Sequence, residues 1–285
     1  MTANAACGTL VTDAPLAHQR WAPAAGAHGR PLLLLHGIGG GRQAWGQHGS
    51  ASGQATGAAL AAAGFTVLAV DFPGYGLSPP IAPFDLPGLA ATVVALVDSL
   101  GLGPAVLVGH SMGGMVAQEV AASAPQVVAG LVLASTSPAF GKPGGDWQTE
   151  FLRSRCAPLD AGLGMAGLAA LLVPTMVAPG TAAGLIAAAM ATMAAVPEAT
   201  YRRALAALVS FDRRAKLPLI SVPTLVITGE HDHTAAPEVA RRMAGRITGA
   251  QVVLVPAAGH LLPIEQPPAF HAAVLAFLAT HLQDR

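Results

Sequence analysis

Short, continuous apolar runs alternate with longer helix-like stretches along most of this chain. Apolar runs without polar alternation are typical of strands buried on both faces, as in a parallel sheet covered by helices. The pattern predicts six strands, at Leu32–Leu35, Phe65–Val70, Ala105–Val108, Leu131–Ala134, Thr224–Thr228 and Val252–Val255.

The stretches between these runs predict helices, because they are Ala-rich or carry apolar residues at helical spacing. Gly64 and Gly101 follow two of them and Pro125 follows a third, at positions where helices commonly stop. The predicted helices are Ser52–Ala63, Leu86–Leu100, Met112–Ala124, Pro237–Gly245 and Pro267–Leu282. Repeated strand–helix units predict an α/β fold.

The strand–helix rhythm stops near Ser137 and resumes after Lys216. Between these points Ala-rich helical pieces, separated by Pro and Gly, predict no strand. The simplest organisation is one core, formed by residues 1–137 and 217–285, with a helical insertion at residues 138–216.

Residues 161–197 of this insertion carry no charged side chain, so a membrane span has to be considered. A spanning helix needs roughly 20 predominantly apolar residues in sequence. Pro174, Pro179 and several glycines interrupt the stretch, and Ala dominates it. We therefore expect short buried helices and no stable membrane insertion.

The composition narrows the classes of partner. Of 285 residues 53% are apolar and 11% are charged, with 15 basic and 15 acidic side chains. A neutral chain gives no electrostatic case for nucleic acid or anionic membrane. The N-terminus lacks a secretory pattern, and two cysteines, Cys7 and Cys156, suit a reduced compartment. We expect a cytoplasmic monomer or homodimer with a small-molecule substrate.

The sequence Gly109-His110-Ser111-Met112-Gly113 follows a predicted strand and begins a predicted helix. A serine on such a sharp turn takes strained backbone geometry, and the flanking glycines avoid side-chain clashes. The hydroxyl then projects to where a base can reach it. This pattern predicts that Ser111 is a nucleophile.

A serine hydroxyl needs a base and an orienting carboxylate, in the chain order Ser, acid, His in hydrolases of this kind. Asp232 follows the predicted strand Thr224–Thr228, and His260 follows Val252–Val255. Carboxyl ends of parallel strands are where open α/β sheets place their sites. Ser111, Asp232 and His260 are therefore the predicted catalytic residues.

Neighbouring residues offer alternatives for these roles. Glu230 is an alternative acid, and His231 and His233 flank Asp232 like metal ligands. No second ligand group with zinc-like spacing accompanies them, so we expect no metal.

A second Gly-rich loop, His36-Gly37-Ile38-Gly39-Gly40-Gly41, also follows a strand. A dinucleotide fingerprint would require glycine where Arg42 stands and an acidic residue about 20 positions later, so no cofactor is expected. The loop suits an oxyanion hole better, with backbone N–H groups from Ile38 and Met112. Asp71 and the turn after it are predicted to be structural.

These motifs together resemble the α/β-hydrolase superfamily, in its capped, serine-nucleophile, esterase-like branch. The matching segments are His36–Gly39, Asp71–Ser78, Gly109–Gly114, Gly229–Pro237 and Gly259-His260. The resemblance implies an eight-stranded, mostly parallel sheet flanked by helices, with a helical cap inserted after strand 6. Serine at position 111 argues against the relatives that attack through a carboxylate.

The cap is expected to set specificity through an apolar pocket. Packing within the cap explains its apolar residues equally well. Arg153, Arg155, Arg202 and Arg203 are expected to lie on an exposed helix face, with binding of a substrate carboxylate as the alternative. Candidate substrate-binding residues are Gly37, Trp147, Met165, Leu172, Met176 and Leu261.

The predicted reaction is cleavage of a carboxylic ester, lactone or thioester of a small, largely apolar substrate through an acyl-enzyme. Two alternatives remain at this stage. The same triad serves carbon–carbon bond hydrolases and enol-lactonases, and a hydrolase fold can act as a small-molecule receptor. Motifs alone do not choose among these substrates.

Overall fold

The computed structural model of the chain describes residues 8–23, 26–27, 29–46, 55–141 and 144–282. Cys7 and the start of the predicted helix at Ser52 lie outside these residues, so neither prediction is tested there. Cys156 is a free thiol.

Eight strands form one sheet in the order β1-β2-β4-β3-β5-β6-β7-β8. The pairs from β4 to β8 are parallel, whereas β1–β2 and β2–β4 are antiparallel. The strands are β1 Thr9–Val11, β2 His18–Trp21, β3 Leu32–Leu35, β4 Val67–Val70, β5 Ala105–His110, β6 Val128–Ala134, β7 Thr224–Gly229 and β8 Gln251–Val255.

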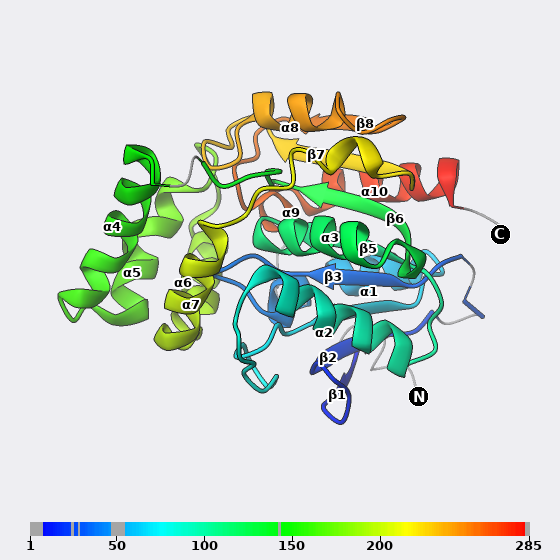
Figure 1. Cartoon of the computed structure of the whole chain (residues 1–285), viewed down its shortest axis with the longest axis horizontal. Helices are drawn as coiled ribbons and strands as arrows, with labels where there is room; N and C mark the ends of the chain where they lie inside the picture. The colour runs from blue at the N-terminus through cyan, green and yellow to red at the C-terminus, as the bar shows by residue number, and fades with distance from the viewer. Residues whose placement is uncertain (1–7, 24–25, 28, 47–54, 142–143, 283–285) are drawn as a thin grey trace.

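Both faces of the sheet are buried under helices, as the continuous apolar runs predict. Along β3, Leu33 and Leu35 pack into one apolar cluster and Leu32 and Leu34 into another. Helices α2, α3 and α8 contribute to the first cluster, and α1, α9 and α10 to the second. Figure 1 shows the sheet between these two layers.

The flanking helices, apart from the short α9, follow the predicted ranges closely. They are α1 Thr56–Ala62, α2 Leu86–Ser99, α3 Met112–Ser123, α8 Pro237–Ala244, α9 Leu262–Glu265 and α10 Pro267–His281. In the part of the chain that the structure describes, four short 3-10 helices join the elements: η1 Arg42–Trp45, η2 Pro125–Val127, η3 Val173–Thr175 and η4 Leu217–Leu219. The six-strand pattern read from apolar runs missed the short strand β1, the mostly polar strand β2 and the short helix α9.

Within the described residues four helices lie between β6 and β7, inside the range predicted for the insertion. They are α4 Asp146–Asp160, α5 Gly164–Leu172, α6 Ala183–Ala194 and α7 Glu198–Leu208. Figure 1 shows them gathered beyond the end of the sheet toward which the β6 arrow points. An antiparallel bridge between Ala139 and Asp212 joins the two ends of this segment. The division at residues 138 and 216 stays a prediction.

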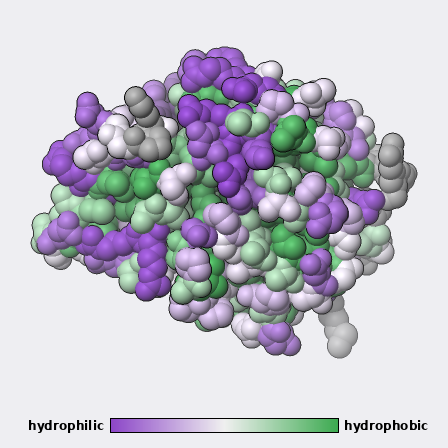
Figure 2. Space-filling view, viewed as in Figure 1, coloured by the Kyte–Doolittle hydropathy of each residue, from purple (hydrophilic) through white to green (hydrophobic). Residues whose placement is uncertain are grey.

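The apolar helices of this segment are short. None of the helices in the described ranges is long and apolar enough to cross a membrane alone, and α6 with α7 reaches that length only with a bend of 94°. Figure 2 shows hydrophobic and hydrophilic side chains interspersed over these helices, at the left of the view.

Candidate active site

Ser111 occupies the sharp turn between β5 and α3. Its backbone has φ 52° and ψ −115°, a conformation that costs energy for any residue with a side chain. A Cβ at Gly113 would overlap the carbonyl group of Leu35, and a Cβ at Gly109 would overlap that of Gly113. The two glycines therefore let the turn close tightly enough to expose the Ser111 hydroxyl.

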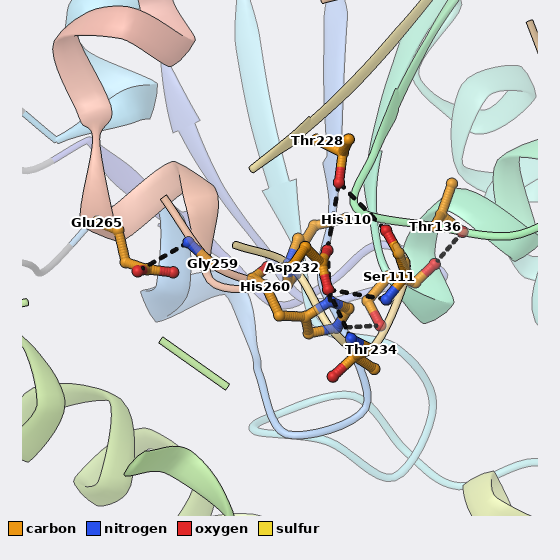
Figure 3. A network of polar contacts seen from close by, with 10 residues as sticks. His110, Ser111, Thr136, Thr228, Asp232, Thr234, Gly259, His260 and Glu265 are labelled. Carbon is orange, nitrogen blue, oxygen red and sulfur yellow. Dashed lines mark hydrogen bonds and ion pairs between the residues drawn. The ribbon is translucent and has the colours of Figure 1, made fainter. Parts of the chain in front are cut away.

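The side chains of Ser111, His260 and Asp232 form one hydrogen-bonded chain (Figure 3). The Nε2 atom of His260 lies 3.1 Å from the Ser111 Oγ atom, and its Nδ1 atom lies 3.0 Å from Oδ2 of Asp232. Ser111 follows β5, Asp232 follows β7 and His260 follows β8, so three strand ends bring together residues up to 149 positions apart. This is the geometry in which a carboxylate orients a base toward a hydroxyl.

Asp232 is held as a carboxylate by its surroundings. The backbone N–H groups of Thr234 and Ala235 each donate to its Oδ1 atom at 2.8 Å. Burial alone would raise the pKa of Asp232, but the neighbouring His260 imidazole and these amide hydrogen bonds outweigh it and hold the pKa well below its usual range. Asp232 is therefore a carboxylate and carries the negative charge that stabilises His260 when His260 is protonated.

The candidate oxyanion loop between β3 and η1 packs directly against the nucleophile. A Cβ at Gly37 would lie 3.3 Å from the Ser111 Cβ atom. The Tyr75 hydroxyl donates to the Ile38 carbonyl at 3.0 Å, which fixes the peptide between Ile38 and Gly39. Met112 is the first residue of α3, so its N–H has no acceptor within its own helix. Ile38 and Met112 remain the predicted oxyanion donors.

The Asp71 turn holds the end of this loop in place through hydrogen bonds. Asp71 accepts the backbone N–H groups of Arg42 at 2.8 Å and Leu77 at 3.1 Å, and it pairs with the Arg42 guanidinium. Arg42 begins η1, at the far end of the Gly-rich loop. These contacts are those of a structural residue, as the sequence interpretation favours.

Glu265, which the sequence interpretation missed, joins the His260 loop to the insertion. Its Oε2 atom accepts the backbone N–H groups of Ala178 at 2.7 Å and Gly259 at 3.0 Å, and the Thr181 hydroxyl at 3.1 Å. Figure 3 shows the contact with Gly259, next to His260. The backbone N–H of His260 in turn donates to the Met176 carbonyl at 2.7 Å. Glu265 therefore positions the loop that carries the predicted base.

Replacing Glu265 with glutamine is expected to lower kcat about tenfold while KM changes little, because a small shift of the base costs much rate. The free energy of unfolding should fall by about 1–3 kcal/mol, the range for hydrogen bonds to a charged group. Ester kinetics and urea unfolding measure the two effects. The matched control is Glu238→Gln on α8, where the carboxylate is 64% exposed. Equal kinetics for both variants would contradict the positioning role.

Two histidines near the site are neutral: His36 is buried and His110 is half-buried. His36 is inaccessible to solvent; its Nε2 atom accepts the Phe72 N–H and its Nδ1–H donates to the Gly37 carbonyl. His110 Nε2–H donates to the His260 carbonyl at 2.7 Å. Burial lowers the pKa of each to about 4.

The protein is therefore expected to lose stability as the pH falls from about 6.5 toward 4. Between these two pH values His36 and His110 are protonated in the unfolded chain but stay neutral in the folded protein, because their pKa is lower there. For the fully buried His36 the loss corresponds to about 3 kcal/mol. Urea unfolding at pH 7.0 and at pH 4.5 measures this loss of stability. Both pH values lie above the lowered pKa of Asp232 in the folded protein. The difference in the free energy of unfolding between the two pH values should shrink in His36→Gln. An unchanged difference would contradict a buried, neutral His36.

Two cavities open at the Ser111 side chain, and both are lined by Ile38, Met176 and Met193. The first, here the Trp45 cavity, is bounded by Trp45, Val173, Leu261, Pro263 and Ile264. The second, here the Phe151 cavity, is bounded by Phe140, Trp147, Phe151, Arg155 and Tyr201. A substrate with two arms can therefore place its central carbonyl at Ser111.

The predicted pocket residues fall into four groups. Gly37 and Leu261 line the Trp45 cavity, Trp147 and Leu172 line the Phe151 cavity, and Met176 lines both. Met165 lines neither, because it is 7% exposed and packs in the apolar core. The sequence interpretation did not include Trp45, Pro263, Ile264 or Tyr201; the position of Pro263 and Ile264 just after His260 was an available signal.

The four insertion arginines do not share one environment. Arg153 is exposed and paired with Glu150, and Arg202 pairs with Asp160 and Glu198. Arg155 instead lines the Phe151 cavity and is half-buried. The expectation of an exposed face is therefore wrong for Arg155, because α4 turns that side chain toward the cavity.

No group of three or more His, Cys, Asp or Glu side chains is arranged to hold a metal ion in the described parts of the chain. The flanking His231 and His233 therefore have no further ligand beside Asp232 within these residues.

Comparison with known proteins identifies the family. Residues 32–273 match the family described as Alpha/beta hydrolase family, which spans most of the chain. The chain belongs to this family. The fold class and the hydrolase class that the sequence predicts are thereby confirmed.

Relatives show the breadth of the family. The chain is 33% identical over 233 residues to the polyketide synthase ThaQ of Burkholderia thailandensis, covering 74% of this chain but only 10% of that protein. It is 30% identical to a pimeloyl-[acyl-carrier protein] methyl ester esterase of Nitrosospira multiformis, over 87% of this chain and 94% of that one. A hydrolase of known structure from Pseudomonas aeruginosa PA01 superposes with a TM-score of 0.79 at 32% identity, covering 95% and 97% of the two chains.

Proposed function

We propose that the protein is a serine hydrolase that cleaves a carboxylic ester, lactone or thioester of a small, largely apolar substrate. The observation that carries this proposal is the 3.1 Å contact between His260 Nε2 and Ser111 Oγ, at the meeting point of two apolar cavities. Similarity to a methyl ester esterase over most of both chains supports the same reaction class.

The proposed reaction has two steps. His260 accepts the Ser111 proton while the serine oxygen attacks the substrate carbonyl, and the backbone N–H groups of Ile38 and Met112 stabilise the oxyanion. His260 then donates its proton to the leaving alcohol. In the second step His260 deprotonates a water molecule, which releases the acid from Ser111. Asp232 stabilises the imidazolium formed in each step.

An acyl-enzyme can be tested without knowing the natural substrate. Phenyl butyrate and 4-nitrophenyl butyrate differ in their leaving group but would give the same butyryl-Ser111 intermediate. In dilute methanol both esters should yield the same ratio of methyl butyrate to butyrate, because water and methanol compete for one intermediate. A ratio that depends on the leaving group would contradict this mechanism.

A further inference from the structure

Arg155 on α4 is the unusual residue of the Phe151 cavity. Its side chain is half-buried, and its Cζ atom lies 3.6 Å from the centroid of the Phe151 ring. Phe151 packs edge-on against Phe140, with ring centroids 4.6 Å apart. The guanidinium group is therefore held on an aromatic platform beside the space that leads to Ser111.

The charge of Arg155 lacks an acidic partner in the described part of the chain. Within the described residues its side chain makes one hydrogen bond, from Nη1 to the Ser154 hydroxyl at 3.0 Å, whereas the guanidinium has five N–H donors. Arg153, two residues earlier on the same helix, is paired with Glu150. Burial lowers the pKa of Arg155, which remains charged at neutral pH. A partly desolvated cation without a counter-charge is costly unless a ligand supplies one.

The other residues that line the Phe151 cavity provide hydrogen-bond donors but no acidic side chain. Among the residues described there, Arg155 is the single Arg or Lys, and Asp and Glu are absent. Tyr201 lines the same cavity and is 1% exposed; burial raises the pKa of its phenol to about 12, against the lowering effect of the Arg155 cation. The Ser135 hydroxyl is buried and has no hydrogen-bond partner among the described residues. An anionic group entering this cavity would find one cation and several hydroxyl donors.

We propose that Arg155 binds a free carboxylate of the substrate, so that the ester cleaved at Ser111 also carries an acid group. This inference rests on the proposed ester hydrolase function. The planar fork of a guanidinium matches the two oxygens of a carboxylate. One cation balances one carboxylate, whereas a phosphate dianion would leave a charge unbalanced in an apolar cavity. The apolar and aromatic lining fits the carbon chain between the two groups.

Two matched ester pairs test this proposal on either side of the scissile bond. The first pair is mono-4-nitrophenyl adipate and 4-nitrophenyl hexanoate, which differ by an acid on the acyl chain. The second is 4-acetoxy-3-nitrobenzoate and 4-acetoxy-3-nitrobenzamide, which differ on the leaving group. In at least one pair we expect Arg155→Met to lower kcat/KM for the acid about 10- to 100-fold and for the neutral ester by less than about twofold, as loss of a charge-assisted hydrogen bond implies.

Matched variants separate binding from packing. Arg155→Lys should recover part of the loss because it keeps the charge but not the fork. Arg153→Met, which removes an exposed arginine of the same helix, should leave both members of each pair unchanged. An equal loss for acid and neutral esters in Arg155→Met, or a wild-type preference for the neutral member of both pairs, would overturn the carboxylate site. Neutral-ester turnover that depends on Ser111 would still uphold the proposed function.

A binding experiment covers the case in which none of the four esters is hydrolysed. In Ser111→Ala protein, calorimetric titration should show hexanoate binding at least about tenfold more tightly than hexanamide. The additional Arg155→Met substitution should remove this difference. Equal affinities for hexanoate and hexanamide would refute the site, whatever the fate of the hydrolase proposal.

Discussion

Replacing Ser111 with alanine is expected to lower kcat for ester hydrolysis by at least about 10⁴-fold. The substitution removes the oxygen that the Nε2 atom of His260 contacts at 3.1 Å, and with it the nucleophile of the proposed acyl-enzyme. What remains is the binding of the substrate and of its oxyanion, which accelerate hydrolysis by water far less. Initial rates with 4-nitrophenyl butyrate, corrected for the uncatalysed reaction, measure the loss.

The fold should be unaffected by this change. Alanine at position 111 has to keep the same positive φ of 52°, so the strain of the turn is neither removed nor increased much. The melting temperature should therefore match that of the wild-type protein, which separates loss of chemistry from loss of folding. Activity within tenfold of wild type in a folded Ser111→Ala protein would refute Ser111 as the nucleophile.

Replacing Asp232 with asparagine should lower kcat by about 10⁴-fold, which is the second large effect. The side chain keeps its size, but it loses the charge that stabilises the His260 imidazolium. An asparagine amide also favours the imidazole tautomer that cannot accept the Ser111 proton. Because KM reflects mainly the apolar cavities, the loss should appear in kcat.

Glu230 provides the matched control for this prediction. It is a neighbouring carboxylate two residues away, but its side chain is exposed. Glu230→Gln should therefore leave kcat within about twofold of wild type, as surface changes away from a site usually do. A large loss in Glu230→Gln with a small loss in Asp232→Asn would exchange the two roles.

The sheet interior was predictable because burial on both faces leaves a strong signal. The runs around Leu32–Leu35 and Ala105–Val108 are apolar at every position, and each became a central parallel strand. The strand β2, His18–Trp21, is buried only at its two ends and includes His, Gln and Arg. Its place depends on pairing with β4, about 50 residues later, which local pattern does not encode.

The candidate site was predictable where chemistry constrains the chain locally. The glycines beside Ser111 are required by the strained turn, and Asp232 and His260 follow strands whose ends meet. The roles of Arg155 and Glu265 depend instead on which helix face meets which cavity or loop. Met165 illustrates the same limit, because an apolar residue in a helical insertion suits a pocket lining and a packed core equally well.

The central claim is that Ser111 is a nucleophile activated by His260, and a fluorophosphonate probe tests it most directly. The wild-type protein should acquire one covalent adduct, located at Ser111 by peptide mass spectrometry, and the folded His260→Ala variant should acquire none over the same time. An adduct at another residue, or no adduct at Ser111 of the folded wild-type protein, would contradict the account.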